Sequence, residues 1–233
     1  MKLPIYQVDA FTAKLYGGNP AAIVPLTEWL PAPIMQKIAV ENNLSETAFF
    51  VPEGELFELR WFTPEYEIDL CGHATLATAH ILFTELGYQK DVIHFHTQKA
   101  GTLTVSKKDD LYTLDFPSRP SKITDAPEGL LEAMGGKTPI EVLKSRDYML
   151  VYETETDVVA LKPDFSALAK FDIMGVIATA KGDHSDFVSR FFAPRAGVPE
   201  DPVTGSAHST LIPYWAKRLG KSQLYARQIS SRG

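Results

Sequence analysis

Two short segments, one in each half of the chain, combine a glycine with side chains that can transfer protons. They are residues 71–74 (CGHA) and residues 204–207 (TGSA), the second flanked by Asp201 and His208. Each predicts the start of a helix, where the first backbone N–H groups lack partners within the helix. Such an end attracts a carboxylate or phosphate, and a glycine lets the ligand approach the backbone closely. We therefore expect both segments to bind a small anionic ligand.

A third candidate is Glu46, in the segment 43–50 (NLSETAFF), where an otherwise apolar strand begins. A carboxylate beside aromatic rings loses hydration, which moves its pKa toward neutrality and suits it to act as acid and base in turn. Position alone favours an ordinary exposed acid at a strand end. A catalytic role for Glu46 is therefore a hypothesis on its position alone.

The elements around the two glycine segments repeat. Residues 60–64 (RWFTP) and 190–194 (RFFAP) are similar, and an acidic loop follows each before its glycine segment. The second loop is longer than the first. A strand, a loop and a helix in the same order predict an internal duplication, with the two helix ends facing each other across a cleft between two domains.

The rest of the chain alternates short apolar stretches with turns. Strands are predicted at 5–11, 21–25, 47–51, 57–62, 92–96, 102–106, 111–116, 141–144, 147–153, 158–161, 175–180 and 187–192. Helices are predicted at 33–40, 72–86, 128–134 and 204–219, and the polar, proline-rich segment 118–127 is predicted to be a linker. This order predicts an α+β protein of two similar domains, residues 1–117 and 118–233.

Composition excludes several classes of protein. The 233 residues carry a formal net charge of −6, which disfavours a nucleic-acid partner. No apolar run is long enough to span a bilayer, and the first residues resemble a strand rather than a signal peptide. The single cysteine, Cys71, excludes an intramolecular disulfide and a cysteine-rich zinc site. We expect a cytoplasmic protein.

Five motifs in order resemble the PhzF-like family of phenazine biosynthesis isomerases, which shares the diaminopimelate epimerase fold. They are 9–12 (DAFT), 18–22 (GNPAA), 45–49 (SETAF), 69–75 (DLCGHAT) and 200–208 (EDPVTGSAH). The resemblance covers essentially the whole chain. It implies two pseudo-symmetric domains, each a curved, mostly antiparallel sheet around a central helix. It also implies no metal, no cofactor and a homodimer.

Site residues follow from the resemblance, motif by motif. Glu46 corresponds to the carboxylate that moves a proton between two carbons of the substrate. The residues expected to bind or orient the substrate are Asn19, Gly72, His73, Ala74, Asp201, Thr204, Gly205 and Ser206. The implied function is a cofactor-independent isomerase of a small carboxylate-bearing metabolite, whose identity the sequence does not reveal.

Two departures from the family's pattern keep alternatives open. Epimerases of this fold use two thiols, whereas residues 201–203 (DPV) supply no second cysteine, so a two-thiol epimerase is excluded. An epimerase that uses Cys71 and another base stays possible, as does a non-catalytic binding or interaction protein. Family members also continue beyond the position of residue 233, so we expect the second domain to lack the family's last strands.

Overall fold

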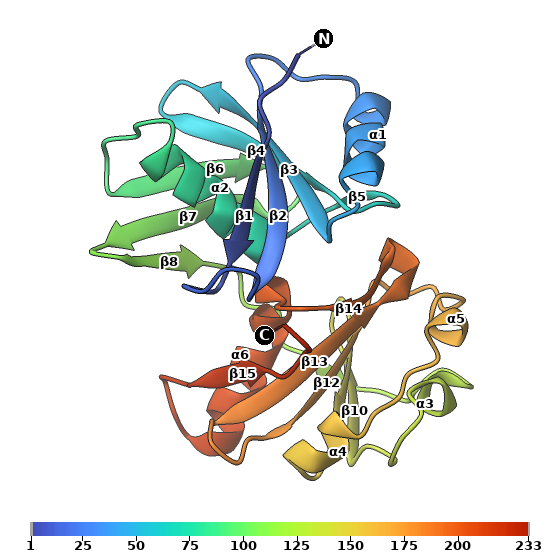
Figure 1. Ribbon diagram of the computed structural model, residues 1–233. Helices are drawn as coiled ribbons and strands as arrows, with labels where there is room; N and C mark the ends of the chain where they lie inside the picture. Colours follow the sequence, from blue (N-terminus) through green and yellow to red (C-terminus); the bar gives the residue numbers. More distant parts are fainter. Residues whose placement is uncertain (1, 233) are drawn as a thin grey trace. The chain divides into compact units, whose positions relative to one another are not determined.

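The computed structural model describes residues 2–232, and the chain divides into two compact units, residues 1–117 and 118–233 (Figure 1). Each unit has its own sheet and one long helix that follows a strand and a loop. The sheets are mixed, with mostly antiparallel pairs, which confirms the predicted α+β class. No helix among the described residues is long and apolar enough to cross a membrane.

In the first unit, eight strands of residues 2–117 form one sheet in the order β1-β2-β3-β4-β6-β7-β8, and β5 pairs with β4. The pairs β2–β3 and β4–β6 are parallel, and the others are antiparallel. The elements are β1 (Tyr6–Ala10), β2 (Asn19–Pro25), α1 (Ala32–Asn42), β3 (Glu46–Glu53), β4 (Leu56–Phe62), β5 (Glu67–Ile68), α2 (Gly72–Thr84), β6 (Val92–Thr97), β7 (Gly101–Lys108) and β8 (Leu111–Asp115).

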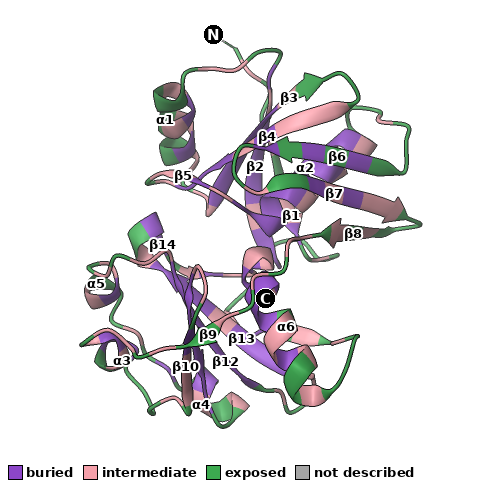
Figure 2. Cartoon of the chain, turned by 180° about the vertical axis from the view of Figure 1, so that it is seen from behind, coloured by how far each residue is buried: buried purple, intermediate pink, exposed green. Residues whose placement is uncertain are grey.

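Helix α2 is the central helix of this unit, and it packs on β1, β2 and β3. It is rich in small residues and buried along most of its length (Figure 2). The sequence pattern groups Leu76, Ala79, His80 and Phe83 on one face, and of these Ala79 is buried while the other three are only partly buried. Strand β8 covers part of this face, because the ring of Tyr112 stacks on Phe83 with 5.5 Å between centroids. Close packing of small residues therefore fixes where α2 begins relative to β2 and β3.

The second unit has seven strands within residues 118–232, in the order β14-β13-β12-β11-β10-β9, with β15 pairing with β13. The pairs β11–β12 and β13–β15 are parallel. The elements are β9 (Lys122–Ile123), α3 (Leu130–Ala133), β10 (Glu141–Lys144), β11 (Tyr148–Val151), α4 (Glu155–Val159), α5 (Phe165–Leu168), β12 (Val176–Lys181), β13 (Phe187–Ala193), the 3-10 helix η1 (Pro194–Ala196), β14 (Val198–Asp201), the 3-10 helix η2 (Gly205–Ala207), α6 (His208–Leu219) and β15 (Ala226–Gln228).

An arginine–glutamate pair marks the same place in both units. Arg60 on β4 donates through Nε and Nη2 to the two carboxylate oxygens of Glu67, at 2.6 and 2.7 Å. Arg190 on β13 donates in the same way to Glu200, at 2.7 and 2.9 Å. The equivalent pair, and the parallel strand that each unit adds beside it, support the internal duplication.

One predicted strand is wrong: Val158–Leu161 does not form a strand, and helix α4 runs through Glu155–Val159 instead. The reason is a capping box, in which Thr154 Oγ1 accepts from the N–H of Asp157 and Asp157 accepts from the N–H of Thr154. Local hydrogen bonds at the helix start thus outweigh the β-branched pair of valines that suggested a strand.

Two other segments are more ordered than the sequence indicates. The predicted linker 118–127 contributes the short strand β9, which pairs with β10 through Lys122 and Ile123. The acidic loop before the second glycine segment contains η1 and strand β14, which pairs with β13 at a bulge. Both segments are ordered by backbone pairing with a neighbouring strand, and no local sequence pattern predicts that pairing.

Candidate active site

In the first unit, two strand ends and a helix end meet. Asn19 is the first residue of β2 and Glu46 is the first residue of β3, and these strands run parallel with Ala21 opposite Glu46. Helix α2 begins at Gly72 and packs against both strands. The parallel register therefore brings Asn19, Glu46 and the start of α2 to the same edge of the sheet.

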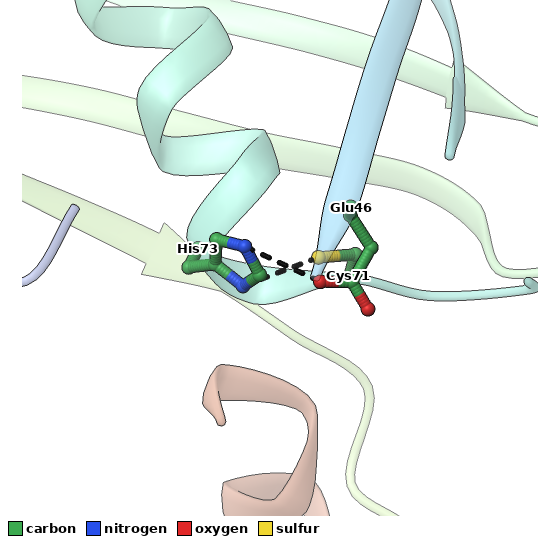
Figure 3. Close-up of side chains that lie close together, drawn as sticks. All are labelled: Glu46, Cys71 and His73. Atoms are coloured by element: carbon green, nitrogen blue, oxygen red, sulfur yellow. Dashed lines mark hydrogen bonds and ion pairs between the residues drawn. The ribbon is translucent and has the colours of Figure 1, made fainter. Parts of the chain in front are cut away.

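The side chains of Glu46, Cys71 and His73 converge at this edge (Figure 3). Oε2 of Glu46 lies 3.3 Å from Nε2 of His73, and Sγ of Cys71 lies 3.5 Å from Nδ1 of the same ring. All three residues are buried, and Glu46 is only 8 % exposed. The carboxylate is therefore not the exposed strand-end acid that its position in the sequence alone favours.

His73 is neutral at physiological pH. Burial lowers its pKa to about 3, against a smaller opposing effect of the backbone carbonyl of Pro20. The side-chain amide of Asn19 donates to Nδ1 over 3.2 Å. We infer from this contact that Nδ1 accepts and that the single proton of the neutral ring lies on Nε2, the nitrogen nearer Glu46.

The start of α2 has no side-chain cap. Cys71 is the N-cap residue in an extended conformation, and its side chain makes no capping hydrogen bond. The N–H groups of Gly72, His73 and Ala74 therefore belong to an uncapped first turn with a partial positive charge. Thr75 donates to the carbonyl of Cys71, which fixes the backbone entering the helix. The predicted helix start is present, and binding of an anion there stays a prediction.

In the second unit, Asp201 and Thr204 are buried together with a residue that the sequence did not suggest. The hydroxyl of Thr204 donates to Asp201, and the side chain of Gln228 bridges the two. Gln228 accepts from the N–H of Thr204 at 2.7 Å and donates to the carbonyl of Asp201 at 2.7 Å. Strand β15 delivers Gln228 by pairing with β13. Nothing local to Gln228 signals this role.

The second glycine segment begins as a 3-10 turn rather than as an α-helix. Gly205–Ala207 form η2, and the α-helical part starts at His208. The hydroxyl of Ser206 accepts from Nη2 of Arg146 at 3.1 Å, and Arg146 is held by the buried carboxylate of Asp147 at 2.9 Å. Arg146 and Asp147 were not among the predicted site residues, although two adjacent opposite charges between predicted strands are a signal that could have pointed to them.

His208 contacts the backbone of this second group. Its Nδ1 lies 3.0 Å from the carbonyl of Thr204, which accepts the ring proton. Burial lowers the pKa of His208, and the Thr204 carbonyl opposes this shift. The structure therefore brings the predicted residues together as two groups, one in each unit: Asn19, Glu46, Gly72, His73 and Ala74 in the first, and Asp201, Thr204, Gly205 and Ser206 in the second.

Comparison with known proteins identifies the family. The phenazine biosynthesis-like protein family, PhzC-PhzF, matches residues 8–232 of this chain. A protein of Pseudomonas aeruginosa named an uncharacterized isomerase is 52 % identical over 235 residues, which covers 100 % of this chain and 89 % of that protein. The chain belongs to the phenazine biosynthesis-like family.

Solved structures agree with this assignment. The crystal structure of a PhzF-family phenazine biosynthesis protein from Enterococcus faecalis has a TM-score of 0.89 and 51 % identity, covering 100 % of this chain and 89 % of that chain. A hydroxyproline epimerase from Agrobacterium vitis has a TM-score of 0.62 at 10 % identity, covering 95 % and 78 % of the two chains. That second likeness shows the fold alone, and it is the epimerase-type fold that the motifs predict.

Proposed function

We propose that this protein is a cofactor-independent isomerase of a small carboxylate-bearing metabolite, with Glu46 as its single acid–base group. The observation that carries the proposal is the buried contact of 3.3 Å between Glu46 and the neutral ring of His73. The isomerase names of its relatives support the reaction class. The chemistry needs one group that accepts a proton and returns it to another atom.

In the proposed reaction, a carboxylate oxygen of Glu46 accepts a proton from one carbon of the substrate. The electron pair of that C–H bond shifts into a conjugated system, and a double bond moves along the substrate. The protonated carboxyl group exchanges its proton with solvent and then donates a proton to a different carbon, so atoms and charge balance without a second base and solvent deuterium enters the product. We propose that the ring of His73, whose Nε2 lies 3.3 Å from Oε2, orients the carboxylate so that Oε1 is the oxygen that exchanges the proton.

The substrate's own carboxylate needs hydrogen-bond donors, and we propose the uncapped start of α2 at Gly72–Ala74 for this role. In the second unit, Gly205 and Ser206 are proposed to contribute as well, with Asp201 and Thr204 as polar partners of the ligand. Substitution of Ser206 with Ala is expected to raise KM more than it lowers kcat. The sequence predicts that both groups bind the same ligand molecule, and we keep this as part of the proposal.

The decisive experiment follows solvent deuterium into the product. Candidate ligands are first selected from aromatic and alicyclic carboxylates by thermal shift, and each one that binds is then incubated in D₂O. Glu46→Gln keeps the shape of the side chain and removes the base, so exchange is expected to fall by about 10²–10⁴-fold, the range for a general acid–base group.

The matched control is Glu53→Gln, at the exposed far end of the same strand, which is expected to leave exchange unchanged. Undiminished exchange in Glu46→Gln would remove Glu46 from the mechanism. Ligands that bind without any exchange in the wild type would instead support the alternative of a non-catalytic binding protein.

One observation favours a second candidate function. The thiol of Cys71 lies 3.5 Å from Nδ1 of His73, so an epimerase that uses Cys71 as one of its bases has the necessary group in place. We rank this candidate second because Cys71 is the chain's single cysteine and a thiol pair is therefore absent.

The proposal also covers the oligomeric state and the cellular location of the enzyme. We infer a homodimer, as the family resemblance implies, and a cytoplasmic location, as the sequence analysis predicts. Light scattering coupled to gel filtration measures the first, and a single-chain mass in solution would overturn it. Fractionation of cells that express the protein measures the second.

A further inference from the structure

Three different metal-binding donors converge at the edge of the first sheet. One donor atom each from Glu46, Cys71 and His73 forms a set in which all atoms lie within 4.8 Å of one another. Figure 3 shows that one donor comes from β3 and two from the start of α2. Within residues 2–232, this is the one group of histidine, cysteine and acidic side chains with such spacing.

The distances suit a tetrahedral ion. Zinc with a Zn–S bond of about 2.3 Å and a Zn–N bond of about 2.0–2.1 Å separates its two donors by about 3.5 Å. Sγ of Cys71 and Nδ1 of His73 lie 3.5 Å apart. An ion at Nδ1 replaces the hydrogen bond from Asn19. Oε2 of Glu46 lies 3.3 Å from Nε2 of the same ring, so the proposed site requires the carboxylate to move toward Nδ1 when the ion binds.

Charge and donor chemistry point to the same class of ion. A thiolate and a carboxylate together cancel the two positive charges of the cation, so the filled site is neutral, as a buried site requires. A sulfur, a nitrogen and an oxygen donor select zinc and similar thiophilic ions over magnesium and calcium, which prefer oxygen. Three protein ligands leave the fourth position open.

We propose that Glu46, Cys71 and His73 form a binding site for one Zn²⁺ or a similar thiophilic divalent cation. The binding itself does not depend on the proposed function. One consequence does rest on it: because the ion occupies the carboxylate that transfers the proton, Zn²⁺ inhibits the isomerase. The site is then a point of metal sensitivity in an enzyme that needs no metal for turnover.

The test titrates the reduced full-length protein with Co²⁺, which replaces Zn²⁺ and reports its ligands by absorption. A thiolate–Co²⁺ charge-transfer band in the near ultraviolet is expected to saturate at one ion per chain, and added Zn²⁺ is expected to abolish it. Cys71→Ser is expected to lose the band. Glu46→Gln and His73→Asn are expected to weaken binding by at least about tenfold, the smallest effect expected of even a supporting residue at a metal site.

The matched control is the double variant His94→Gln/His96→Gln. Both histidines are exposed on β6 and can bind Co²⁺ weakly, but without sulfur. The double variant is expected to keep the charge-transfer band unchanged. Absence of the band in the wild type would overturn the proposal, as would unchanged affinity in both Glu46→Gln and His73→Asn. Circular dichroism of each variant confirms that it is folded.

The two proposals fail separately. Saturable Zn²⁺ binding that leaves deuterium exchange intact would keep the metal site and contradict the proposed role of Glu46. Loss of exchange in Glu46→Gln, together with no Co²⁺ band in the wild type, would keep the isomerase and remove the metal site.

Discussion

The side-chain amide of Asn19 donates to Nδ1 of His73 over 3.2 Å, between residues that are 54 positions apart in the chain. Both side chains are buried, and Asn19 is fully so. We infer that this contact places the proton of the neutral ring on Nε2. Asn19 is therefore proposed to act on Glu46 through His73, as a positioning residue. The resemblance alone suggests a substrate contact for it, and this expectation stays a prediction.

Asn19→Asp tests this relationship with an almost isosteric change. An aspartate accepts instead of donating, so the ring proton is expected to move to Nδ1 and leave Nε2 without its N–H toward Glu46. The ¹⁵N chemical shifts of His73 report the tautomer directly, and deuterium exchange is expected to fall by about 10²-fold or more. Asn42→Asp, in the same unit but bonded to Thr47, is the control. An unchanged tautomer in Asn19→Asp would contradict the assignment.

Acid is expected to destabilise the protein through His73. Its pKa is about 3 in the folded chain and about 6.5 in the unfolded chain, so only the unfolded chain binds this proton between those values. The stability is therefore complete above about pH 6.5 and falls as the pH drops toward 3. Between pH 6.5 and 4.5 the loss from this group is about 2–3 kcal/mol. Urea unfolding at both pH values measures it.

The control for this prediction is His73→Asn, which cannot titrate. The variant is expected to lose less stability than the wild type between the two pH values. Equal losses in the two proteins would show that His73 is already charged in the folded chain or exposed to solvent.

Thr204→Val is expected to destabilise the second unit by about 1–3 kcal/mol. The hydroxyl of Thr204 donates to Asp201 and accepts from Gln228 at 3.0 Å, and valine leaves both buried partners with an unmade bond. Thr204→Ser keeps the hydroxyl and is expected to cost less. The midpoints of urea unfolding compare the two variants, and equal midpoints would show that the hydrogen bonds contribute nothing beyond shape.

Cys71→Ser separates the two candidate reactions. An isomerase that depends on Glu46 is expected to keep its deuterium exchange within a few fold, because Cys71 does not transfer the proton. An epimerase that depends on the thiol is expected to lose turnover. Chiral chromatography of the product, run beside the exchange assay, distinguishes these results, and a complete loss of exchange in Cys71→Ser would favour the epimerase.

Thr154→Ala tests why a predicted strand is a helix. Removing the capping hydroxyl is expected to cost about 0.5–2 kcal/mol of stability, because the N–H of Asp157 loses its acceptor. Thr154→Ser, which can keep the cap, is the control. A cost below that range in Thr154→Ala would mean that packing of Val158, rather than the cap, holds α4 in place.

Much of the fold follows from local patterns. The alternating apolar stretches predict most of the strands, and the first glycine segment predicts where α2 begins, whereas the second precedes α6 as a 3-10 turn. The repeated arginine motif predicts the duplication, because Arg60 and Arg190 occupy equivalent strands. Local patterns fail where a helix cap or a neighbouring strand determines the secondary structure, as for α4 and β9. In both places the hydrogen bonds of a few residues have more influence on the backbone than the amino-acid composition of the segment.

The sequence by itself determined which groups can do chemistry and in what order they occur, because residue type and helix starts are local properties. Only the tertiary structure decided that Glu46 is buried against the ring of His73, and that Asn19 contacts Nδ1 of the same ring. It also brought Gln228 to Asp201. These contacts depend on strand register and on parallel pairing between distant segments, and a one-residue shift in register would turn each side chain to the other face of its sheet.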